Sequence, residues 1–186
     1  VPLVCNEKYC RDMMGLSLKN VTLNLFDRSK LIYHELGEML FTHFGISGPL
    51  VLSASSHISE MEQNRYKIQI DLKPGLSLEQ LDARIQRDFK ENQNRIFGNS
   101  LGKLLPAKLV PVMVKLSGIP GETKINSVTR EQRINLGMIM KNFPLTVKGF
   151  RPVEEAIITS GGVNVREINP KTMESKLVSG LFFAGE

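Results

Sequence analysis

The 186-residue sequence has no Trp, and aromatic residues make up only 6% of it. A protein that binds single-stranded nucleic acid by base stacking presents several aromatic side chains, so a stacking surface is not expected here. No apolar run approaches the roughly 20 residues that a membrane-spanning helix needs. No charged stretch followed by an apolar one opens the chain, as a signal peptide would require. We therefore expect a protein without a membrane partner.

Cysteine is almost as scarce. Cys5 and Cys10 are the only two, and no histidine lies near them in the sequence. A structural zinc site needs four ligands, so the pair is too sparse for one and we expect no metal site. A Cys5–Cys10 disulfide is sterically possible, but two free thiols in a reducing compartment are the simpler interpretation. The cysteines thus favour a cytoplasmic location.

The sequence also lacks an initiator Met, and its end is abrupt. Leu181 to Ala184 form an apolar run typical of a fully buried strand, and Gly185 suggests a tight turn after it. In α/β proteins such a turn presents backbone N–H groups to a nucleotide phosphate, together with the helix N-terminus that follows. We therefore expect a segment of a longer protein, whose function is that of a part.

What the sequence does have is a basic central stretch. Residues 77–142 hold eleven Lys and Arg and six Asp and Glu, an excess equal to the chain's net charge of +5. Strand patterns change to helix patterns at the start of this stretch and back to strand patterns at its end. The sequence predicts an α+β fold, with a β-rich body of residues 1–76 and 143–160, a helical subdomain of residues 77–142 and a last segment of residues 161–186.

Within the body, residues 16–26 and 31–36 predict a hairpin, and residues 39–42 a further strand. The next residues predict a loop leading into a helix, with Ser47 near the cap position and Pro49 in the first turn. Other strands are expected at residues 65–72, 145–150 and 156–160.

Three helices are expected in residues 77–142. Residues 77–80 and 129–132 are capping boxes, with Ser or Thr followed three positions later by Gln. Residues 106–116 predict a helix that ends at Gly118. In the last helix the expected inward residues are Ile134, Leu136, Met138 and Ile139.

The basic helical stretch raises the question of nucleic acid. Its positive charges alternate with acids along amphipathic helices, a pattern typical of a solvated face. Phosphate binding needs a clustered basic stripe, and no two Lys or Arg are adjacent in the sequence. Nucleic acid is therefore not the favoured partner. The alternative interpretation is a free-standing binding module whose basic helices dock nucleic acid or an acidic protein.

Paired glycines follow the strand expected at residues 156–160. Gly161 and Gly162 allow positive φ and close approach of the backbone to a flat or anionic ligand. An ordinary tight turn is the simpler interpretation of an isolated Gly-Gly pair.

Three blocks of sequence resemble a flavoprotein family. Residues 159–177 (TSGGVNVREINPKTMESKL), followed by residues 180–186 (GLFFAGE), resemble its C-terminal signature. Residues 37–49 (GEMLFTHFGISGP) resemble a second block, and residues 15–21 a third. On these residues the chain is similar to the BaiN-like (also called YhiN-like or aminoacetone oxidase-like) NAD(P)/FAD-dependent oxidoreductases.

The resemblance implies an FAD domain built from the two ends of a longer polypeptide, with a large insertion between them. The insertion would be a β-barrel-like or bifurcated-sheet body carrying an inserted three-helix subdomain, and residues 161–186 would begin the returning part of the FAD domain. The parent protein would use FAD and NAD(P)H to act on a small-molecule substrate. The Gly-x-Gly-x-x-Gly loop that grips the FAD pyrophosphate is absent from this sequence. We therefore expect this fragment alone to bind no cofactor and to be inactive.

The resemblance also implies cofactor-binding residues in the last segment. Gly161, Gly162 and Val163 would approach the isoalloxazine ring, and Gly185 and Glu186 would lie by the FAD phosphates and ribityl chain.

Catalytic candidates come from the second block. Thr42, His43 and Ser47 would face the flavin from the insertion side. His43 can act as a general acid or polarise a substrate carbonyl, because a histidine exchanges protons near neutral pH. A structural histidine bonded to backbone at a strand end is the alternative interpretation.

Overall fold

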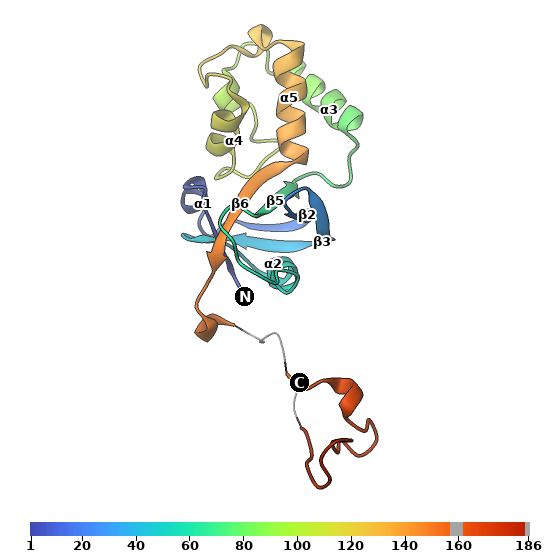
Figure 1. Ribbon diagram of the computed structural model, residues 1–186. Coiled ribbons are helices and arrows are strands. Elements are labelled where there is room, and N and C mark those ends of the chain that lie inside the picture. The colour runs from blue at the N-terminus through green and yellow to red at the C-terminus, as the bar shows by residue number, and fades with distance from the viewer. Residues whose placement is uncertain (157–161, 185–186) are drawn as a thin grey trace.

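The computed structural model describes residues 1–156 and 162–184, and its main body is a closed six-stranded barrel with helices at one end (Figure 1). The strands are β1 (Leu3–Cys5), β2 (Ser17–Asp27), β3 (Lys30–Phe41), β4 (Gly45–Ser47), β5 (Tyr66–Asp71) and β6 (Phe143–Phe150). The α-helices are α1 (Tyr9–Asp12), α2 (Pro49–Ser55), α3 (Leu78–Glu91), α4 (Val110–Ser117) and α5 (Arg130–Lys141). Short 3-10 helices are η1 (Phe97–Asn99), η2 (Ile125–Ser127), η3 (Val153–Glu155) and η4 (Val165–Glu167).

The barrel has the strand order β1-β4-β3-β2-β5-β6, and β6 pairs back onto β1 to close it. Every neighbouring pair is antiparallel. Closure removes the free edges that an open sheet would expose to other chains. The predicted α+β class with a barrel-like body is confirmed, and the barrel is the form that it takes.

One strand of the barrel was predicted as two. Residues 31–36 and 39–42 were expected to be separate strands, but β3 runs without a break from Lys30 to Phe41. Its pairing with β2 shifts register between Leu18 and Val21. Such a bulge bends the ladder without ending it, so β3 pairs with β2 along most of its length and with β4 at its last residues.

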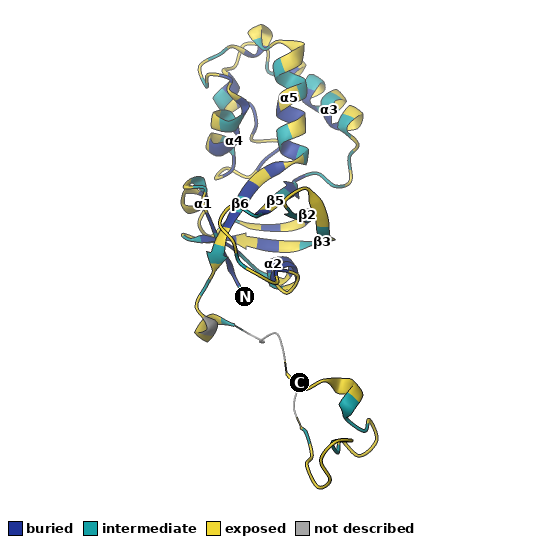
Figure 2. Ribbon diagram, in the orientation of Figure 1, coloured by how far each residue is buried: buried dark blue, intermediate teal, exposed yellow. Residues whose placement is uncertain are grey.

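The barrel core follows from the two-residue period of its strands. Tyr66, Ile68 and Ile70 of β5 are buried, and the intervening Lys67 is exposed (Figure 2). Across the ladder Ile68 pairs with Leu25 and Ile70 with Leu23, which are also buried. Burying one such side chain contributes about 1.5–3 kcal/mol, so the alternation alone fixes which face of β5 points inward.

The helices are inserted between two paired strands. β5 ends at Asp71, β6 begins at Phe143, and Ile70 and Phe143 are ladder partners. In Figure 1, α3, α4 and α5 lie together beyond one end of the barrel, with α5 in contact with both others. The division of the chain into separately folding domains at residues 76 and 143 stays a prediction.

Both predicted capping boxes are confirmed. The Ser77 hydroxyl accepts from the Gln80 N–H at 3.2 Å, and the Gln80 side chain accepts from the Ser77 N–H at 2.9 Å. Thr129 and Gln132 repeat the arrangement at the start of α5. Gly118 ends α4 in the left-handed conformation, with φ of 70°.

Two helix predictions need correction. The helix expected from Pro106 begins only at Val110, where Pro111 occupies the first turn, because that is the one place where a missing N–H costs no helical hydrogen bond. Met138 is exposed instead of inward, and Gly137 takes its place against α3. A Cβ on Gly137 would lie 3.5 Å from Leu78 Cδ1, so the small residue sets the inward face of α5.

Charged contacts join the helices to the barrel. Lys141 Nζ lies 2.6 Å from Asp71 Oδ2 and also donates to the carbonyls of Lys73 and Leu76. Lys108 Nζ, ahead of α4, donates to the Met14 carbonyl at 2.7 Å. Both lysines satisfy backbone carbonyls at the base of the insertion, which holds the helices against the end of the barrel.

Candidate functional site

The β3–β4 turn holds the candidate residues of the second sequence block. The Thr42 N–H donates to the Gly45 carbonyl at 2.9 Å, and the Gly45 N–H donates to the Thr42 hydroxyl at 3.2 Å. Thr42 therefore closes the turn with both its backbone and its side chain. Its hydroxyl positions the turn, and His43 projects from it as an exposed residue.

Two glycines make this turn possible. A Cβ on Gly45 would lie 2.3 Å from the Leu3 carbonyl oxygen and 2.7 Å from the Cys5 nitrogen, because β1 passes directly beside it. Gly48 has φ of 100° and caps α2, where a Cβ would meet the Met39 Cα at 3.0 Å. Ser47 was predicted near this cap position, and it directly precedes the cap as the last residue of β4, paired with Leu40. The cap needs a conformation that glycine adopts and serine does not.

Beside His43 the turn meets the end of β6. The rings of His43 and Phe44 lie edge to face with centroids 5.0 Å apart, and the Arg151 guanidinium carbon lies 4.5 Å above the Phe44 ring. The backbone N–H of Arg151 donates to the Pro2 carbonyl at 3.1 Å. Stacking of a guanidinium on an aromatic face is favourable. Phe44 thus brings the β3–β4 turn and the residue that follows β6 into one cluster.

A carboxylate completes this cluster. Arg151 donates to both oxygens of Glu155, with the Arg151 Nε–Glu155 Oε2 bond at 3.0 Å. This hydrogen-bonded guanidinium, and to a smaller extent the nearby charge of His43, lowers the pKa of Glu155 below its usual value. The same pairing raises the pKa of Arg151. The barrel end therefore presents an exposed imidazole next to a fixed carboxylate.

The last segment, residues 162–184, is held by contacts within itself. Asn169 exchanges bonds with the Met173–Glu174 stretch, and the Gly180 N–H donates to Glu174 Oε1 at 2.7 Å. The buried strand predicted at residues 181–184 is wrong. Phe182 makes a single bridge to Glu174 and is 61% exposed, and Figure 2 shows this segment exposed along most of its described length.

Two of the predicted cofactor-binding residues fall in this segment. Gly162 has φ of +123°, and a Cβ placed on it would meet nothing within 4 Å. Val163 is about half exposed. The open, glycine-favoured backbone at Gly162 fits close approach of a flat ligand. Gly161, Gly185 and Glu186, and the strand expected at residues 156–160 beyond Ala156, lie outside the described residues.

In the described part of the chain, the cysteines and the metal-ligating side chains add no further site of this kind. Cys5 and Cys10 are free and buried, and the hydrogen bond from Cys10, with burial, raises the pKa of the Cys5 thiol. No group of three metal-ligating side chains occurs in residues 1–156 and 162–184. No helix in that same part of the chain is long and apolar enough to cross a membrane.

Comparison with known proteins identifies the family of this barrel. Residues 1–158 match the family described as "HI0933-like protein barrel and H2TH domain". The chain belongs to the HI0933-like family.

Relatives of the HI0933-like chain carry two kinds of name. It is 33% identical over 180 residues to a protein of Haemophilus influenzae and 34% identical over 188 residues to one of Escherichia coli, both named "Ribosomal RNA dihydrouridine synthase". These matches cover 97% and 100% of the chain but only 42% and 44% of the relatives. A "3-dehydro-bile acid delta(4,6)-reductase" of Clostridium scindens is 27% identical over 159 residues, which cover 84% of the chain and 39% of that protein. The chain thus spans less than half the length of these relatives, and the resemblance to the BaiN-like flavoprotein family is confirmed.

Some residues of the HI0933-like site escaped the sequence reasoning. Phe44, Arg151 and Glu155 stand out only through their contacts with one another. One signal was present, since Arg151 and Glu155 have opposite charges four positions apart, directly after a strand. The other two histidines, His34 and His57, are exposed as well.

Proposed function

We propose that this chain is the insert, substrate-side domain of a longer FAD-dependent oxidoreductase that uses NAD(P)H. The observation that carries the proposal is the match of residues 1–158 to one family, together with relatives named for a reductase and a dihydrouridine synthase. The chain spans less than half of those relatives, which leaves the main FAD-binding fold to other parts of the parent. The fragment alone is then inactive.

The substrate class follows from chemistry that the relatives' names have in common. Making dihydrouridine from uridine, and reducing a delta(4,6) dehydro bile acid, both add hydrogen across a carbon–carbon double bond conjugated to a carbonyl. We propose this enone-like group as the substrate of the parent. A nucleobase in RNA is favoured over a bile acid, because the two relatives named for ribosomal RNA share more identity over more of the chain.

In such a reduction a hydride adds to the carbon β to the carbonyl, and a proton adds to the α carbon. The hydride is the chemistry that reduced flavin supplies when bound. The proton, or a hydrogen bond to the carbonyl, is what this chain can supply. His43 is exposed at the barrel end and can donate such a proton as a general acid, with the Arg151-bound Glu155 carboxylate nearby.

The remaining predicted residues have supporting roles in this proposal. Thr42 holds the turn that presents His43, and Ser47 anchors β4 behind it. Gly162, with Gly161 and Val163, would allow the backbone to approach the isoalloxazine ring, since Gly162 has an open, glycine-favoured conformation. Gly185 and Glu186 would lie by the FAD phosphates and ribityl chain.

The test uses the full-length parent. Purified protein should show the visible absorption of flavin and should oxidise NAD(P)H in the presence of an enone or a uridine-containing RNA. His43→Ala should keep the flavin and slow turnover by roughly 10²-fold if His43 is a general acid. His57→Ala is the matched control, because His57 is also exposed but contacts Ser53 and the Tyr33 ring instead of the β3–β4 turn. A colourless parent would leave the alternative, a binding module whose basic helices dock nucleic acid or an acidic protein.

A further inference from the structure

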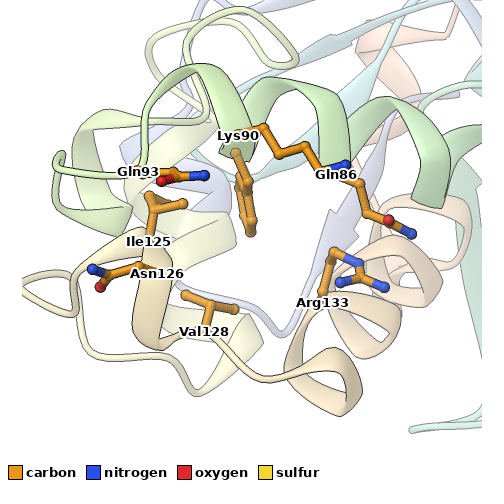
Figure 3. Close-up of a pocket in the computed structure, with 8 residues that line it drawn as sticks. Gln86, Lys90, Gln93, Ile125, Asn126, Val128 and Arg133 are labelled. Atoms are coloured by element: carbon orange, nitrogen blue, oxygen red, sulfur yellow. The ribbon is translucent and has the colours of Figure 1, made fainter.

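A hollow of about 300 Å³ lies within the helical insertion, lined by residues between Gln86 and Arg133 (Figure 3). Gln86 and Lys90 come to it from α3, and Arg133 from α5. Ile125 and Asn126 of η2 line the opposite side. A volume of this size lies at the small end of ligand sites and suits one small ring with its substituents.

Ion pairing neutralises some of the charges of this segment and leaves others free. Three of its six acids are taken up in ion pairs with bases of the same segment: Asp82 with Arg133 at 2.6 Å, Asp88 with Arg84 at 3.1 Å, and Glu91 with Lys103 at 2.8 Å. Six further bases are exposed and make no ion pair in the described part of the chain: Arg87, Lys90, Arg95, Lys115, Lys124 and Arg130. Glu79, Glu122 and Glu131 are outside these ion pairs as well, so the six exposed bases outnumber the remaining acids of the segment two to one.

One of these cations lines the hollow, and others lie near it in the chain. Lys90 lines it, and Arg87 lies one turn away on α3. Lys124 directly precedes Ile125 and forms an antiparallel backbone bridge with Ile96. The Ile125 N–H donates to the carbonyl of Arg95, so Arg95 lies close by as well. No carboxylate is among the described residues that line the hollow. The rim is thus suited to a phosphate on either side of a bound group.

The interior of the hollow offers apolar surface and amides. Phe89 and Ile125 form buried apolar surface there. Gln86 Nε2 donates to Asp82, which leaves its carbonyl oxygen to accept, and Asn126 Oδ1 accepts from Ser127, which leaves its amide N–H₂ to donate. Gln93 adds a second amide. Paired donors and acceptors of this kind match the edge of a nucleobase.

We propose that this hollow, lined by Gln86, Lys90, Gln93, Asn126 and Arg133, binds one unstacked nucleotide of a single-stranded RNA, with flanking phosphates on Lys90 and Lys124. The inference rests on the proposed RNA substrate and adds a second contact, on residues outside the His43 cluster, that holds the RNA while another nucleotide reacts. The base enters edge-on between the amides, so this mode needs no exposed aromatic platform.

Binding is tested with the full-length parent and a fluorescein-labelled single-stranded RNA of about 15 nucleotides, a length within the range of single-strand binding sites. Fluorescence anisotropy is measured over a range of salt concentrations. Lys90→Gln should weaken binding roughly fivefold or more and reduce the slope of log affinity against log salt by about 1. Lys115→Gln is the matched control, an exposed free cation on α4 outside the hollow, and should change affinity less than about twofold.

A second comparison tests the base. An abasic RNA of the same length should bind more weakly than the normal RNA, and the double change Gln93→Ala with Asn126→Ala should remove that difference. Equal losses in Lys90→Gln and Lys115→Gln would overturn the proposal, since they indicate diffuse electrostatics. If these variants of the hollow instead raise the KM for NAD(P)H and leave RNA affinity unchanged, the hollow binds the dinucleotide, and the proposal is again overturned. Because anisotropy requires neither flavin nor turnover, failure here is distinguishable from failure of the proposed reductase activity.

Discussion

Gly45→Ala tests how the barrel closes around the candidate site. The methyl group would lie 2.3 Å from the Leu3 carbonyl oxygen and 2.7 Å from the Cys5 nitrogen, both of them backbone atoms of β1. Neither can rotate away as a side chain can. The clash is relieved only if β4 moves off β1, which breaks the Leu3–Ile46 pairing and lengthens the 3.0 Å bond from the Cys5 N–H to the Phe44 carbonyl.

The expected cost follows from those bonds. Two or three backbone hydrogen bonds at about 1 kcal/mol each give about 2–3 kcal/mol, in line with the usual cost of overpacking a closed site. The alanine's lower unfolded-state entropy recovers less than about 1 kcal/mol of this. The net cost is then about 1–3 kcal/mol, and since each kcal/mol lowers Tm by about 2–4 °C for a chain of this size, we expect a fall of about 2–12 °C.

Gly149→Ala is the matched control for this measurement. Gly149 and Gly45 pair with the same residue, Val4, from the two sides of β1, but a Cβ on Gly149 meets nothing within 4 Å. Thermal unfolding followed by far-ultraviolet circular dichroism should show Gly149→Ala within about 0.5 kcal/mol of wild type. Equal Tm values for the two variants would refute the claim that close approach of β1 and β4 requires glycine.

Further predictions concern charge, caps and cofactor. Arg133 lowers the pKa of Asp82 from its usual 3.8, so this pair stabilises the fold above that pH and the contribution is lost as pH falls through the lowered value. Asp82→Asn should therefore lower the free energy of unfolding by about 1 kcal/mol at pH 7, allowing for partial exposure, and should not change it at acid pH. A loss of the same size at both pH values in urea unfolding would contradict this. Thr129→Ala should cost about 1 kcal/mol through loss of the α5 cap, and Ser127→Ala, whose hydroxyl donates only to its neighbour Asn126, should cost under about 0.5 kcal/mol in the same assay. In the parent, Gly162→Val should weaken or abolish flavin binding because valine strains a backbone with φ of +123°, and undiminished absorbance at saturating FAD would argue against the assignment. The 186-residue chain purified alone should be colourless. A stoichiometric yellow complex would argue against the proposal that other parts of the parent bind the FAD.

Local signals in the sequence predicted local structure well. The capping boxes at Ser77 and Thr129 and the stop at Gly118 each depend on contacts within four residues, and all three are confirmed. The alternation in β5 likewise needs only the two-residue period of a strand. Burial predicted from composition alone did less well. Leu181 to Ala184 are apolar enough for a buried strand, but burial needs a second layer, and Phe182 is exposed.

The candidate site also has residues that local sequence predicted and residues that depend on distant contacts. A motif picked out Thr42, His43 and Ser47 because they are adjacent in sequence, yet it could not separate their roles. Only the hydrogen bonds show that Thr42 holds the turn and that Ser47 belongs to β4. Phe44, Arg151 and Glu155 depend on strand order, which no local pattern encodes.

Strand order is what connects the two family blocks physically. β1 lies between β4 and β6 in the barrel, so the turn before β4 and the end of β6 reach the same place although more than a hundred residues separate them. The chain that continues toward Gly161 and Gly162 therefore leaves the barrel at the Arg151–Glu155 pair, beside His43. We predict that Thr42–His43 and Gly161–Gly162 converge on one face of the flavin in the parent. Arg151→Ala should then lower turnover with little loss of Tm, because it frees Glu155 and Phe44 from their fixed positions without disturbing a buried residue. If Arg151→Ala leaves turnover unchanged while His43→Ala slows it, the Arg151–Glu155 pair that follows β6 has no role in the reaction, and this prediction is wrong.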